Sequence, residues 1–477
     1  VRGNRYVFNI TKAYSAGYTT PGEAVLQPGS NLDYELSVDD PSSKYYDYNG
    51  QYQINSDKPS IDLLAGINAP AYMTTIALQN NDKGEADFAK LTTHKLQLLD
   101  GDGNVATYKY DTYNGKVVID GIRMYKGLSN ASKGIDTIPI PNDYEIDLKN
   151  DLPLKLYCMT GARIINTSGY KLVVKIGNIT HTIPVNIINT ASRIDTEGTA
   201  NCYIPPLTPG AYGFNASFMG NGDGTGTGVF DGYGFVTPLG QDLQTTGFKN
   251  GYIAGSYDLK VVKLLWQDQK DLITQVAYRN IGTTSYGVER RIEFVKGKGT
   301  GNAVIGMYDT DGTLQWSWHI WCTENPEVFY LVKNPTTKKS TKNVYYMMDR
   351  NIGATSSNVA DPNSIGLCYQ FGRKDPFMGP TSFGQNVEKP VYGLYNEPKS
   401  FNFYSNNSAN STKLTLQYTI THPMDMVGGL NSGATSHSWI ILNTPTFRTN
   451  DNTTEAACRL WGSNFIASGS GYITDTA

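Results

Sequence analysis

The chain carries almost no net charge. Its 40 Lys and Arg residues nearly balance 43 Asp and Glu residues, which leaves a formal charge of −3 over 477 residues. Proteins that bind nucleic acid or anionic lipid usually need a strong positive field, because phosphate groups attract Lys and Arg. The one basic cluster, Lys333 to Lys342, is interspersed with Pro, Ser and Thr and is typical of a solvated linker. We therefore expect no nucleic-acid partner.

Cysteine is also scarce. The five residues Cys158, Cys202, Cys322, Cys368 and Cys458 include no Cys-x-x-Cys pair and no His at the spacing of a zinc ligand. Zinc and iron–sulfur sites are therefore not expected, and we predict no cofactor. The thiols are either free and buried as small apolar groups, or two of them are paired. Cys202 with Cys322 is one such pair, but a disulfide requires a closeness that sequence does not establish.

Long apolar runs are missing. No stretch approaches the roughly 18 apolar residues of a membrane span, so we expect that the chain is not an integral membrane protein. No charged and then apolar signal peptide opens it, and it lacks an initiator Met. We expect a processed or partly observed chain.

Tyrosine and glycine, in contrast, are abundant. The chain has 33 Tyr and 49 Gly, and only 17% of its residues are charged. This composition is typical of extracellular β-domains with many turns, whereas cytosolic enzymes have more charge and more helix formers. The length is too great for one core and predicts three or four domains.

Short runs with alternating apolar residues predict strands throughout the first 190 residues. Asn4 to Ala13, Asn31 to Val38 and Tyr48 to Ile54 cannot bury a core alone and are expected to complete a sheet. Seven further runs predict an immunoglobulin-like sandwich: Met73 to Leu78, His94 to Leu99, Ala106 to Tyr110, Lys116 to Ile119, Leu154 to Met159, Tyr170 to Ile176 and Thr182 to Ile187.

The expected organisation is mainly β, with tandem β-sandwiches followed by a partial α+β domain. The predicted boundaries are terminal strands of a β-domain at 1–58, an immunoglobulin-like sandwich at 59–188, a second β-sandwich at 189–335 and an incomplete domain at 336–477. One helix is expected in the last domain, from Thr453 to Trp461, with Asn452 as its cap.

A β-hairpin with three of the six Trp residues lies in the second predicted sandwich. Ala303 to Tyr308 and Thr313 to Trp321 are rich in β-branched and aromatic residues and are joined through a turn that ends in Gly312. Trp316, Trp318 and Ile320 share one face, and Ser317, His319 and Trp321 share the other. Apolar bulk on both faces predicts a strand packed on both sides.

The same region carries a family resemblance. The blocks Leu264 to Asp268 (LLWQD), Gly301 to Val304 (GNAV), Trp316 to Trp321 (WSWHIW), Met348 to Asn351 (MDRN) and Tyr369 to Phe377 (YQFGRKDPF) resemble the C-terminal half of large surface lipoproteins of Bacteroidales. In those proteins the region lies beside fimbrillin, or type V pilin, domains. Its last part resembles the Fibrobacter succinogenes major paralogous domain, which has some likeness to the C-type lectin fold.

A shorter resemblance lies at the start of the chain. Val1 to Ile10 (VRGNRYVFNI), Pro21 to Ala24 and Tyr48 to Tyr52 resemble the last strands of a fimbrillin-like domain, although Gly3 departs from the usual pattern. The resemblances imply a tip or accessory subunit of a fimbria that acts in adhesion at the cell surface or outer membrane and is not an enzyme. They imply export as a lipoprotein, assembly with other subunits by donor-strand exchange, and a host or bacterial surface ligand.

Two other functions stay open beside this one. The chain could be a surface glycan-binding lipoprotein with a lectin-like C-terminal module, or a non-adhesive anchor or spacer in the pilus. Two aromatic clusters are candidate platforms for a sugar face: Tyr45, Tyr46 and Tyr48, and Tyr369 and Phe371 with Arg373. Core or inter-strand packing explains both clusters equally well.

A calcium loop is the one candidate metal site. Asp100, Asp102, Asn104 and Asp111 partly match the ligand positions of such a loop. Val105 occupies the position where that turn needs Gly, so a plain hairpin turn is the favoured interpretation. No metal is therefore predicted.

No catalytic set stands out. The glycine-rich stretch Gly220 to Gly228 matches neither phosphate-binding pattern and is expected to be a surface loop. His319 lacks the context of a metalloprotease or a nucleophile elbow, which favours a hydrogen-bonded structural histidine. Asp136 to Ile138 and Asp475 to Ala477 are similar to the acceptor pattern of protein O-glycosylation in Bacteroidales.

Overall fold

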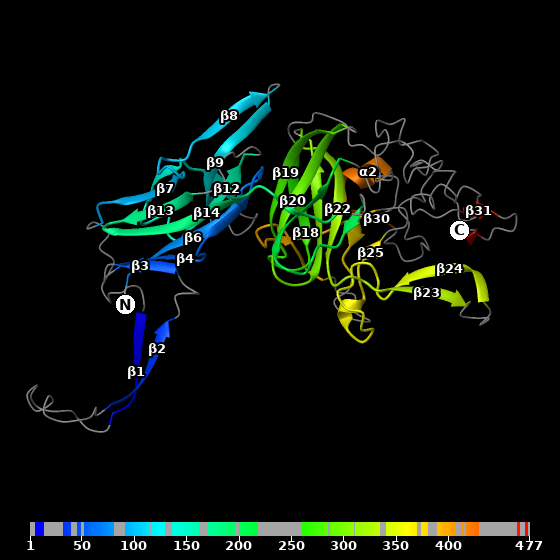
Figure 1. Cartoon of the computed structure of the whole chain (residues 1–477), viewed down its shortest axis with the longest axis horizontal. Coiled ribbons are helices and arrows are strands. Elements are labelled where there is room, and N and C mark those ends of the chain that lie inside the picture. Colours follow the sequence, from blue (N-terminus) through cyan, green and yellow to red (C-terminus); the bar gives the residue numbers. More distant parts are fainter. Residues whose placement is uncertain are drawn as a thin grey trace, which may run out of the picture.

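The computed structural model consists almost entirely of β-strands arranged as tandem sandwiches, which confirms the predicted fold class (Figure 1). The structure describes residues 5–13, 32–39, 45–48, 52–80, 91–113, 116–128, 136–161, 169–195, 200–217, 260–284, 287–309, 311–333, 340–369, 374–379, 389–405, 413, 416–428, 465–467 and 473–475. In some of these segments only the backbone is described. No helix in this part of the chain is long and apolar enough to cross a membrane.

The first sandwich consists of two facing sheets. One has the order β10-β9-β12-β6-β4-β3, with β8 paired to β9, and the other has the order β11-β7-β13-β14-β5. The strands are β3 (Tyr45–Tyr48), β4 (Tyr52–Ser56), β5 (Ile61–Leu64), β6 (Ala71–Asn80), β7 (His94–Leu99), β8 (Tyr108–Tyr113), β9 (Lys116–Leu128), β10 (Asp136–Pro139), β11 (Asp143–Glu145), β12 (Leu154–Thr160), β13 (Tyr170–Ile176) and β14 (Ile179–Ile188).

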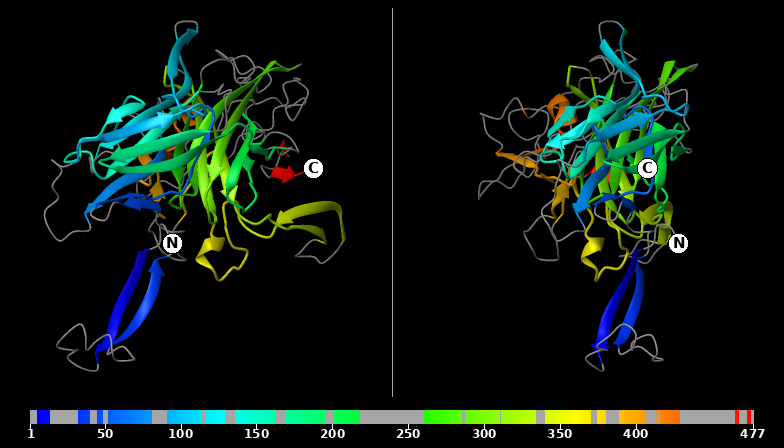
Figure 2. Two further views of the ribbon diagram at one scale, coloured as in Figure 1. Left: turned by 60° about the vertical axis from the view of Figure 1, so that its left-hand side comes forward. Right: turned by 90° about the vertical axis from the view of Figure 1, so that its left-hand side faces the viewer.

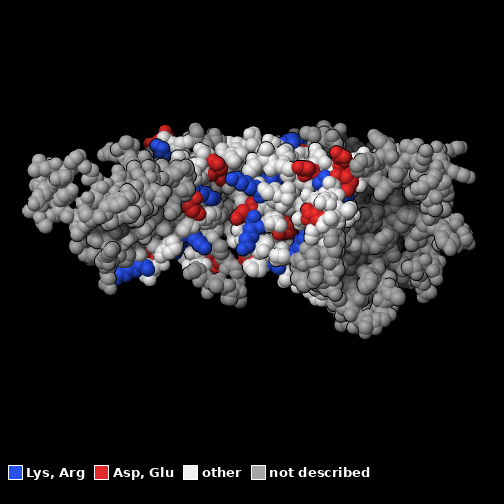
Figure 3. Space-filling view, turned by 90° about the horizontal axis from the view of Figure 1, so that it is seen from below, with Lys and Arg blue, Asp and Glu red and all other residues white. Residues whose placement is uncertain are grey.

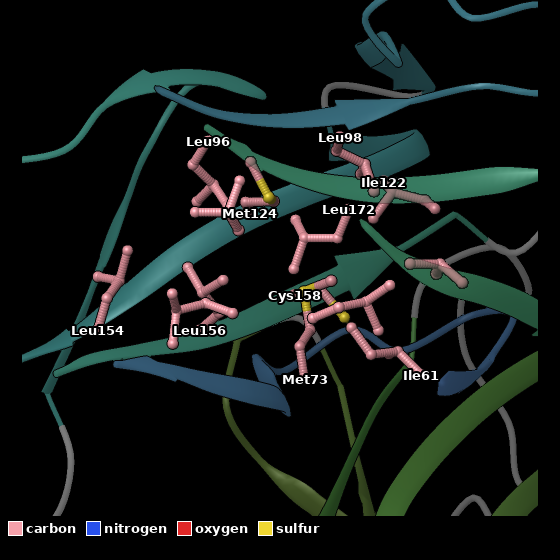
Figure 4. Packing of buried hydrophobic residues seen from close by; sticks show 14 of the residues in the cluster. Ile61, Met73, Leu96, Leu98, Ile122, Met124, Leu154, Leu156, Cys158 and Leu172 are labelled. Atoms are coloured by element: carbon pink, nitrogen blue, oxygen red, sulfur yellow. The ribbon is translucent and has the colours of Figure 1, made fainter. Parts of the chain in front are cut away.

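Strict alternation of side chains builds the core of this sandwich. In β14, every second residue is buried from Ile179 to Ile187, and the residues between them are exposed. Leu156, Leu172 and their neighbours from both sheets fill the space between the layers (Figure 4). Met73, Met124 and Cys158 add sulfur atoms to an otherwise hydrocarbon core.

The predicted strand from Tyr48 to Ile54 is divided in the structure. β3 and β4 form an antiparallel pair in which Tyr48 lies opposite Gln53. An Asn-Gly dipeptide at positions 49–50 of the sequence favours chain reversal over a continuous strand. β4 also pairs with β6, so residues on both sides of the expected boundary at 58 belong to one sheet.

The second sandwich pairs a four-stranded sheet, β15-β17-β20-β19, with a six-stranded sheet, β16-β22-β21-β18-β27-β28. The strands are β15 (Ser192–Arg193), β16 (Cys202–Tyr203), β17 (Gly210–Asn215), β18 (Val261–Gln267), β19 (Ile273–Thr284), β20 (Gly287–Lys296), β21 (Gly301–Tyr308), β22 (Leu314–Cys322), β27 (Val391–Tyr392) and β28 (Pro398–Lys399). The predicted hairpin is the β21–β22 pair. β27 and β28 come from beyond the expected boundary at 335.

The six-stranded sheet is covered on both faces. On its inner face, Trp316, Trp318 and Ile320 pack with Phe214 and the four-stranded sheet. On its outer face, Trp266 and Val304 join a smaller apolar cluster with Phe377, Met378, Val391 and Phe401. This arrangement confirms the prediction that apolar bulk on both sides of the hairpin means a strand packed on both sides.

Several smaller elements complete the description. They are β1 (Arg5–Ala13), β2 (Leu32–Asp39), β23 (Val328–Lys333), β24 (Ser340–Met348), η3 (Pro362–Ser364), β25 (Cys368–Tyr369), β26 (Pro376–Phe377), β29 (Asn402–Ser405), α2 (Leu416–Thr421), β30 (Asp425–Gly428), β31 (Phe465–Ala467) and β32 (Ile473–Asp475). The pairs β1–β2 and β23–β24 stand away from both sandwiches (Figures 1 and 2). The helix predicted from Thr453 to Trp461 lies outside the described residues.

Strand β19 connects the two sandwiches because it is buried on both faces. Val276 and Tyr278 face the core of the second sandwich, and Ala277 packs into the core of the first. Gln275 points the same way as Ala277 and makes two hydrogen bonds across the boundary. Its Oε1 accepts from Leu64 N at 2.9 Å, and its Nε2 donates to Asp62 O at 2.6 Å.

Gly66 allows a close approach between the backbones of the two sandwiches. Its carbonyl oxygen accepts a hydrogen bond from Tyr278 N at 3.1 Å. Its φ is +84°, and a Cβ atom there would lie 2.3 Å from the carbonyl oxygen of Tyr278. Only glycine fits both conditions, so the contact depends on this residue.

We predict that Gly66→Ala destabilises the protein far more than Gly103→Ala, which is the matched control. Gly103 has the same φ of +84°, but an added Cβ would meet nothing within 4 Å. Both variants carry the left-handed penalty of about 1–2 kcal/mol, and only Gly66→Ala should lose about 2 kcal/mol more by forcing the sandwiches apart. Urea unfolding and small-angle scattering measure the two effects. Equal losses in both variants would refute the interface.

Candidate functional site

A chain of polar groups crosses the outer face of the six-stranded sheet. Asn302, on β21, donates from its backbone N to Asp268 Oδ1 at 2.7 Å and from Nδ2 to Asp268 Oδ2 at 2.8 Å. Its Nδ2 also donates to the carbonyl oxygen of Gly353 at 2.9 Å. Its Oδ1 lies 2.9 Å from Nε2 of His319 on β22, whose Nδ1 lies 3.2 Å from Cys202 Sγ.

The hydrogen-bond partners fix the direction of each proton. Asn302 Nδ2 must face the carboxylate and carbonyl acceptors, so Oδ1 accepts and His319 Nε2 carries the hydrogen. His319 Nδ1 is then an acceptor for the Cys202 thiol and for the hydroxyl of Tyr369, which lies 3.5 Å away. His319 is therefore a buried, hydrogen-bonded histidine, as the sequence predicts.

Thiol, imidazole and amide follow one another in the order found in cysteine hydrolases of the papain type. Burial works against that chemistry, because it raises the pKa of Cys202 to about 12 and lowers the pKa of His319 to about 3. At neutral pH both groups are uncharged, and the nucleophilic thiolate is disfavoured. The arrangement therefore suits a network that fixes the sheet and its covering segments better than an activated nucleophile.

A polar cavity of about 340 Å³ opens beside this network. Asp268 and Asn302 form part of its wall, and three lysines, Lys270, Lys298 and Lys389, are the other charged residues that line it. Burial raises the pKa of Asp268 against the opposing effect of its bonds from Asn302. Three ammonium groups against one carboxylate make the cavity suitable for an anionic group.

This excess is local. On the face shown in Figure 3, Lys and Arg are interspersed with Asp and Glu, and neither sign forms a large area. Within the cavity, Lys389 Nζ donates to Asn363 Oδ1 at 3.3 Å, and Lys270 lies over the ring of Tyr392. Lys298 is exposed and forms no ion pair with any residue in the described segments.

The residues that carry the family resemblance converge here. Asp268 ends one block, Asn302 lies in the second, His319 lies in the third, and Gly353 follows the fourth closely. These four sequence blocks therefore lie close together at one place in the structure. Lys298 and Lys389 lie outside the blocks, and no signal in the sequence pointed to them.

The structure describes one member, Tyr369, of the candidate sugar platform of Tyr369, Phe371 and Arg373. The hydroxyl of Tyr369 lies close to His319 Nδ1, and burial raises the pKa of this hydroxyl strongly. Tyr369 is therefore part of the network around His319. Phe371 and Arg373 lie outside the described residues. Their neighbour Lys374 is held by Ser317 and Asp375, with Nζ 2.7 Å from Asp375 Oδ1.

The other candidate platform lies on β3. Tyr45, Tyr46 and Tyr48 are in this strand, opposite Ser56, Asn55 and Gln53 of β4. Their side chains are not among those described.

The candidate calcium loop forms a tight turn. Asp100 Oδ1 accepts hydrogen bonds from the backbone N of Asp102 at 3.0 Å and of Asn104 at 2.9 Å, so this oxygen already caps the turn. Asp102 and Asn104 are exposed, and the side chain of Asp111 is not described. Among the described residues, no group of three or more His, Cys, Asp or Glu side chains could hold a metal ion.

The remaining candidates from the sequence are the cysteines, the two possible glycosylation segments and the glycine-rich stretch. Cys158, Cys202 and Cys322 are free thiols, so the structure does not contain the Cys202–Cys322 disulfide. Asp136 to Ile138 lies on β10, an edge strand, with Asp136 and Ile138 exposed. Gly220 to Gly228 and Cys458 lie outside the described residues, and of Asp475 to Ala477 only Asp475 is described.

The network predicts a specific dependence of stability on pH. His319 titrates near 6.5 when unfolded and near 3 when folded, so the unfolded chain binds more protons between these values. The free energy of unfolding should therefore have its full value above pH 6.5. It should decrease by about 1.4 kcal/mol for each pH unit below pH 6.5. His319→Gln should be less stable at pH 7 but lack this part of the slope. Urea unfolding at pH 7, 6 and 5 compares the two proteins, and parallel curves would contradict the burial of a neutral imidazole.

Comparisons with known proteins establish no family. No family model matches the chain, and no curated protein matches it. Solved structures with a weak likeness include domains 5–6 of the S-layer protein SbsC (9% identity, 59% of this chain and 100% of that chain, TM-score 0.16) and a marsupial T cell receptor (10% identity, 56% and 59%, TM-score 0.14). A third is the CFA/I enterotoxigenic E. coli adhesin CfaE (9% identity, 57% and 99%, TM-score 0.13). At these TM-scores the likenesses carry no argument about function.

Proposed function

We propose that the chain is a non-catalytic adhesive subunit at the tip, or in an accessory position, of a Bacteroidales cell-surface fimbria. The observation that carries the proposal is the cationic cavity formed around the residues of the resemblance blocks. A cavity with three lysines and one carboxylate binds an anionic surface group without needing an activated nucleophile. The uncharged Cys202 and His319 beside it favour binding over catalysis.

The arrangement of the sandwiches supports the same role. An adhesive subunit must present its ligand site at a fixed distance from the cell, and β19 joins the two sandwiches through apolar and hydrogen-bonded contacts. Export as a lipoprotein and donor-strand exchange with neighbouring subunits are parts of this proposal. The β1–β2 pair is compatible with strand exchange, since among the described strands these two pair only with each other.

The second candidate is a surface glycan-binding lipoprotein that is independent of fimbriae. Immunogold electron microscopy of intact cells, with antibody against residues 190–477, distinguishes the two. We expect gold at the distal ends of filaments. Gold spread over the outer membrane without filaments would reject the fimbrial role and favour the lipoprotein, and gold along the filament shaft would indicate a spacer.

Removing charge from the cavity should weaken adhesion. We expect the double variant Lys270→Gln and Lys298→Gln to bind epithelial cells or partner bacteria about five- to thirtyfold less tightly, because each exposed ion pair contributes about 0.5–1 kcal/mol. The matched control, Lys149→Gln and Lys171→Gln, removes the same charge from exposed positions of the first sandwich. Flow cytometry with labelled full-length protein gives the affinities. An equal loss in both double variants would assign the effect to overall charge and count against the cavity.

A further inference from the structure

A second cavity, of about 420 Å³, lies where the two sandwiches meet. Lys58, Tyr72 and Tyr157 reach it from the first sandwich, Asp271 and Gln275 from the second, and Tyr395 from the segment after β27. Its volume is in the range of pockets that hold small organic ligands, and boundaries between domains are common places for them. No residue of this cavity belongs to the lysine-lined cavity described above.

Three tyrosines form an aromatic wall. The rings of Tyr72 and Tyr157 meet edge to face at 5.6 Å between centroids, and those of Tyr157 and Tyr395 do so at 5.2 Å. The hydroxyl groups of Tyr72 and Tyr395 are held by Asp57 and by the carbonyl oxygen of Pro70. The wall is therefore fixed at both ends, and aromatic surface of this kind packs against the C–H face of a sugar ring.

Tyr157, in the middle of the wall, has a hydroxyl group available to a ligand. The residue is only 1% exposed and lines the cavity. Burial raises its pKa to about 12, so the hydroxyl stays neutral and can both donate and accept. It makes no hydrogen bond to any residue within the described segments. The hydroxyl oxygen is reached by solvent although the ring is buried, and the cavity is the side from which a ligand can approach it.

Lys58 contributes a partly desolvated positive charge. Its Nζ lies 4.7 Å from the centroid of the Tyr72 ring, and burial lowers its pKa. Its Nζ forms no hydrogen bond or ion pair with the residues that the structure describes. Lys155 adds a second ammonium group at the exposed rim. The carboxylates of Asp57, Asp62 and Asp271 offset part of the burial of Lys58, and an anion that enters the cavity compensates the remainder.

The opposite wall is polar and fixed in shape. Asp271 N donates to Asn396 Oδ1 at 3.0 Å, and Asn396 Nδ2 donates to Asp271 Oδ1 at 2.8 Å. Both residues have positive φ, 57° for Asp271 and 62° for Asn396, and they are the non-glycine residues with this conformation in the described part of the chain. Such backbone persists where neighbouring contacts hold it, and it is frequent at ligand sites. The reciprocal pair presents carboxylate and amide oxygens to the cavity in a set orientation.

We propose that this cavity binds a saccharide of one or two units that carries a carboxylate group. The C–H face of the sugar packs on the tyrosine wall, its carboxylate meets Lys58, and its hydroxyl groups bond to Tyr157, Asp271 and Asn396. Uronic acids and sialic acids share this chemistry. The inference stands apart from the proposed fimbrial role, because it concerns ligand chemistry and holds wherever the chain is located.

Isothermal titration of the full chain tests the proposal with two acidic probes, digalacturonic acid and 3′-sialyllactose, and their neutral counterparts, galactobiose and lactose. We expect saturable binding of at least one acidic probe, at least tenfold tighter than its neutral counterpart. Lys58→Met should weaken the acidic probe at least about tenfold, and Tyr157→Phe, which keeps the ring, about fivefold. The probe that binds more tightly distinguishes uronic from sialic acid.

Lys298→Met, in the other cavity, is the matched control and should change neither affinity. Urea midpoints check that every variant is folded. The proposal is overturned if no acidic probe binds at about 5 mM, if the neutral sugars bind equally well, or if Lys298→Met has the same effect as Lys58→Met. Failure of these tests leaves the immunogold result unaffected, so the two proposals are judged separately.

Discussion

A β-sheet that is apolar on both faces must be covered twice, and this constraint organises the second half of the protein. The four-stranded sheet and the tryptophans of β22 close the inner face of the six-stranded sheet. The outer face presents Trp266, Val304, Asn302 and His319, which no large second sheet covers within the described part of the chain. Phe377 packs there through apolar contacts, and Gly353 binds there through its carbonyl group. The lysine-lined cavity is the space left where this covering layer meets the end of β18 and the start of β21.

A similar double burial joins the sandwiches. One face of β19 lies in each core, so the two sandwiches are joined by packing along this strand and not by a flexible connection. The amide of Gln275 satisfies backbone groups of β5 that would otherwise be buried without partners. This contact also creates the tyrosine-lined cavity, because neither sandwich alone brings Tyr157, Asp271 and Tyr395 together. The two candidate sites therefore depend on long-range packing and not on local motifs.

The elements that the sequence predicts correctly are those that depend on short-range residue patterns. Alternation in β13 and β14, and the turn at Gly312 between β21 and β22, are short-range signals, and these elements lie where the sequence predicts them. The prediction that His319 is a structural histidine succeeded because the residues near it in the sequence form no catalytic motif. The prediction of one strand from Tyr48 to Ile54 was wrong, because the apolar pattern was given more weight than the Asn-Gly turn signal. The cavity lysines and Tyr395 could not be predicted, because residues far apart in the chain meet only after both sandwiches have formed.

The directional hydrogen bonds around His319 also have a consequence for strand pairing. His319 lies opposite Val304, and Trp318, the next residue back, faces the inner core beside Phe214. A slip of β22 by one residue would exchange the two faces and place an imidazole among aromatic rings, away from Asn302. It would also leave the Asn302 carbonyl and the Cys202 thiol facing an indole that cannot accept a proton from the thiol. The network thus penalises the wrong register, and it lets a hydrophobic strand with three tryptophans pair in only one way.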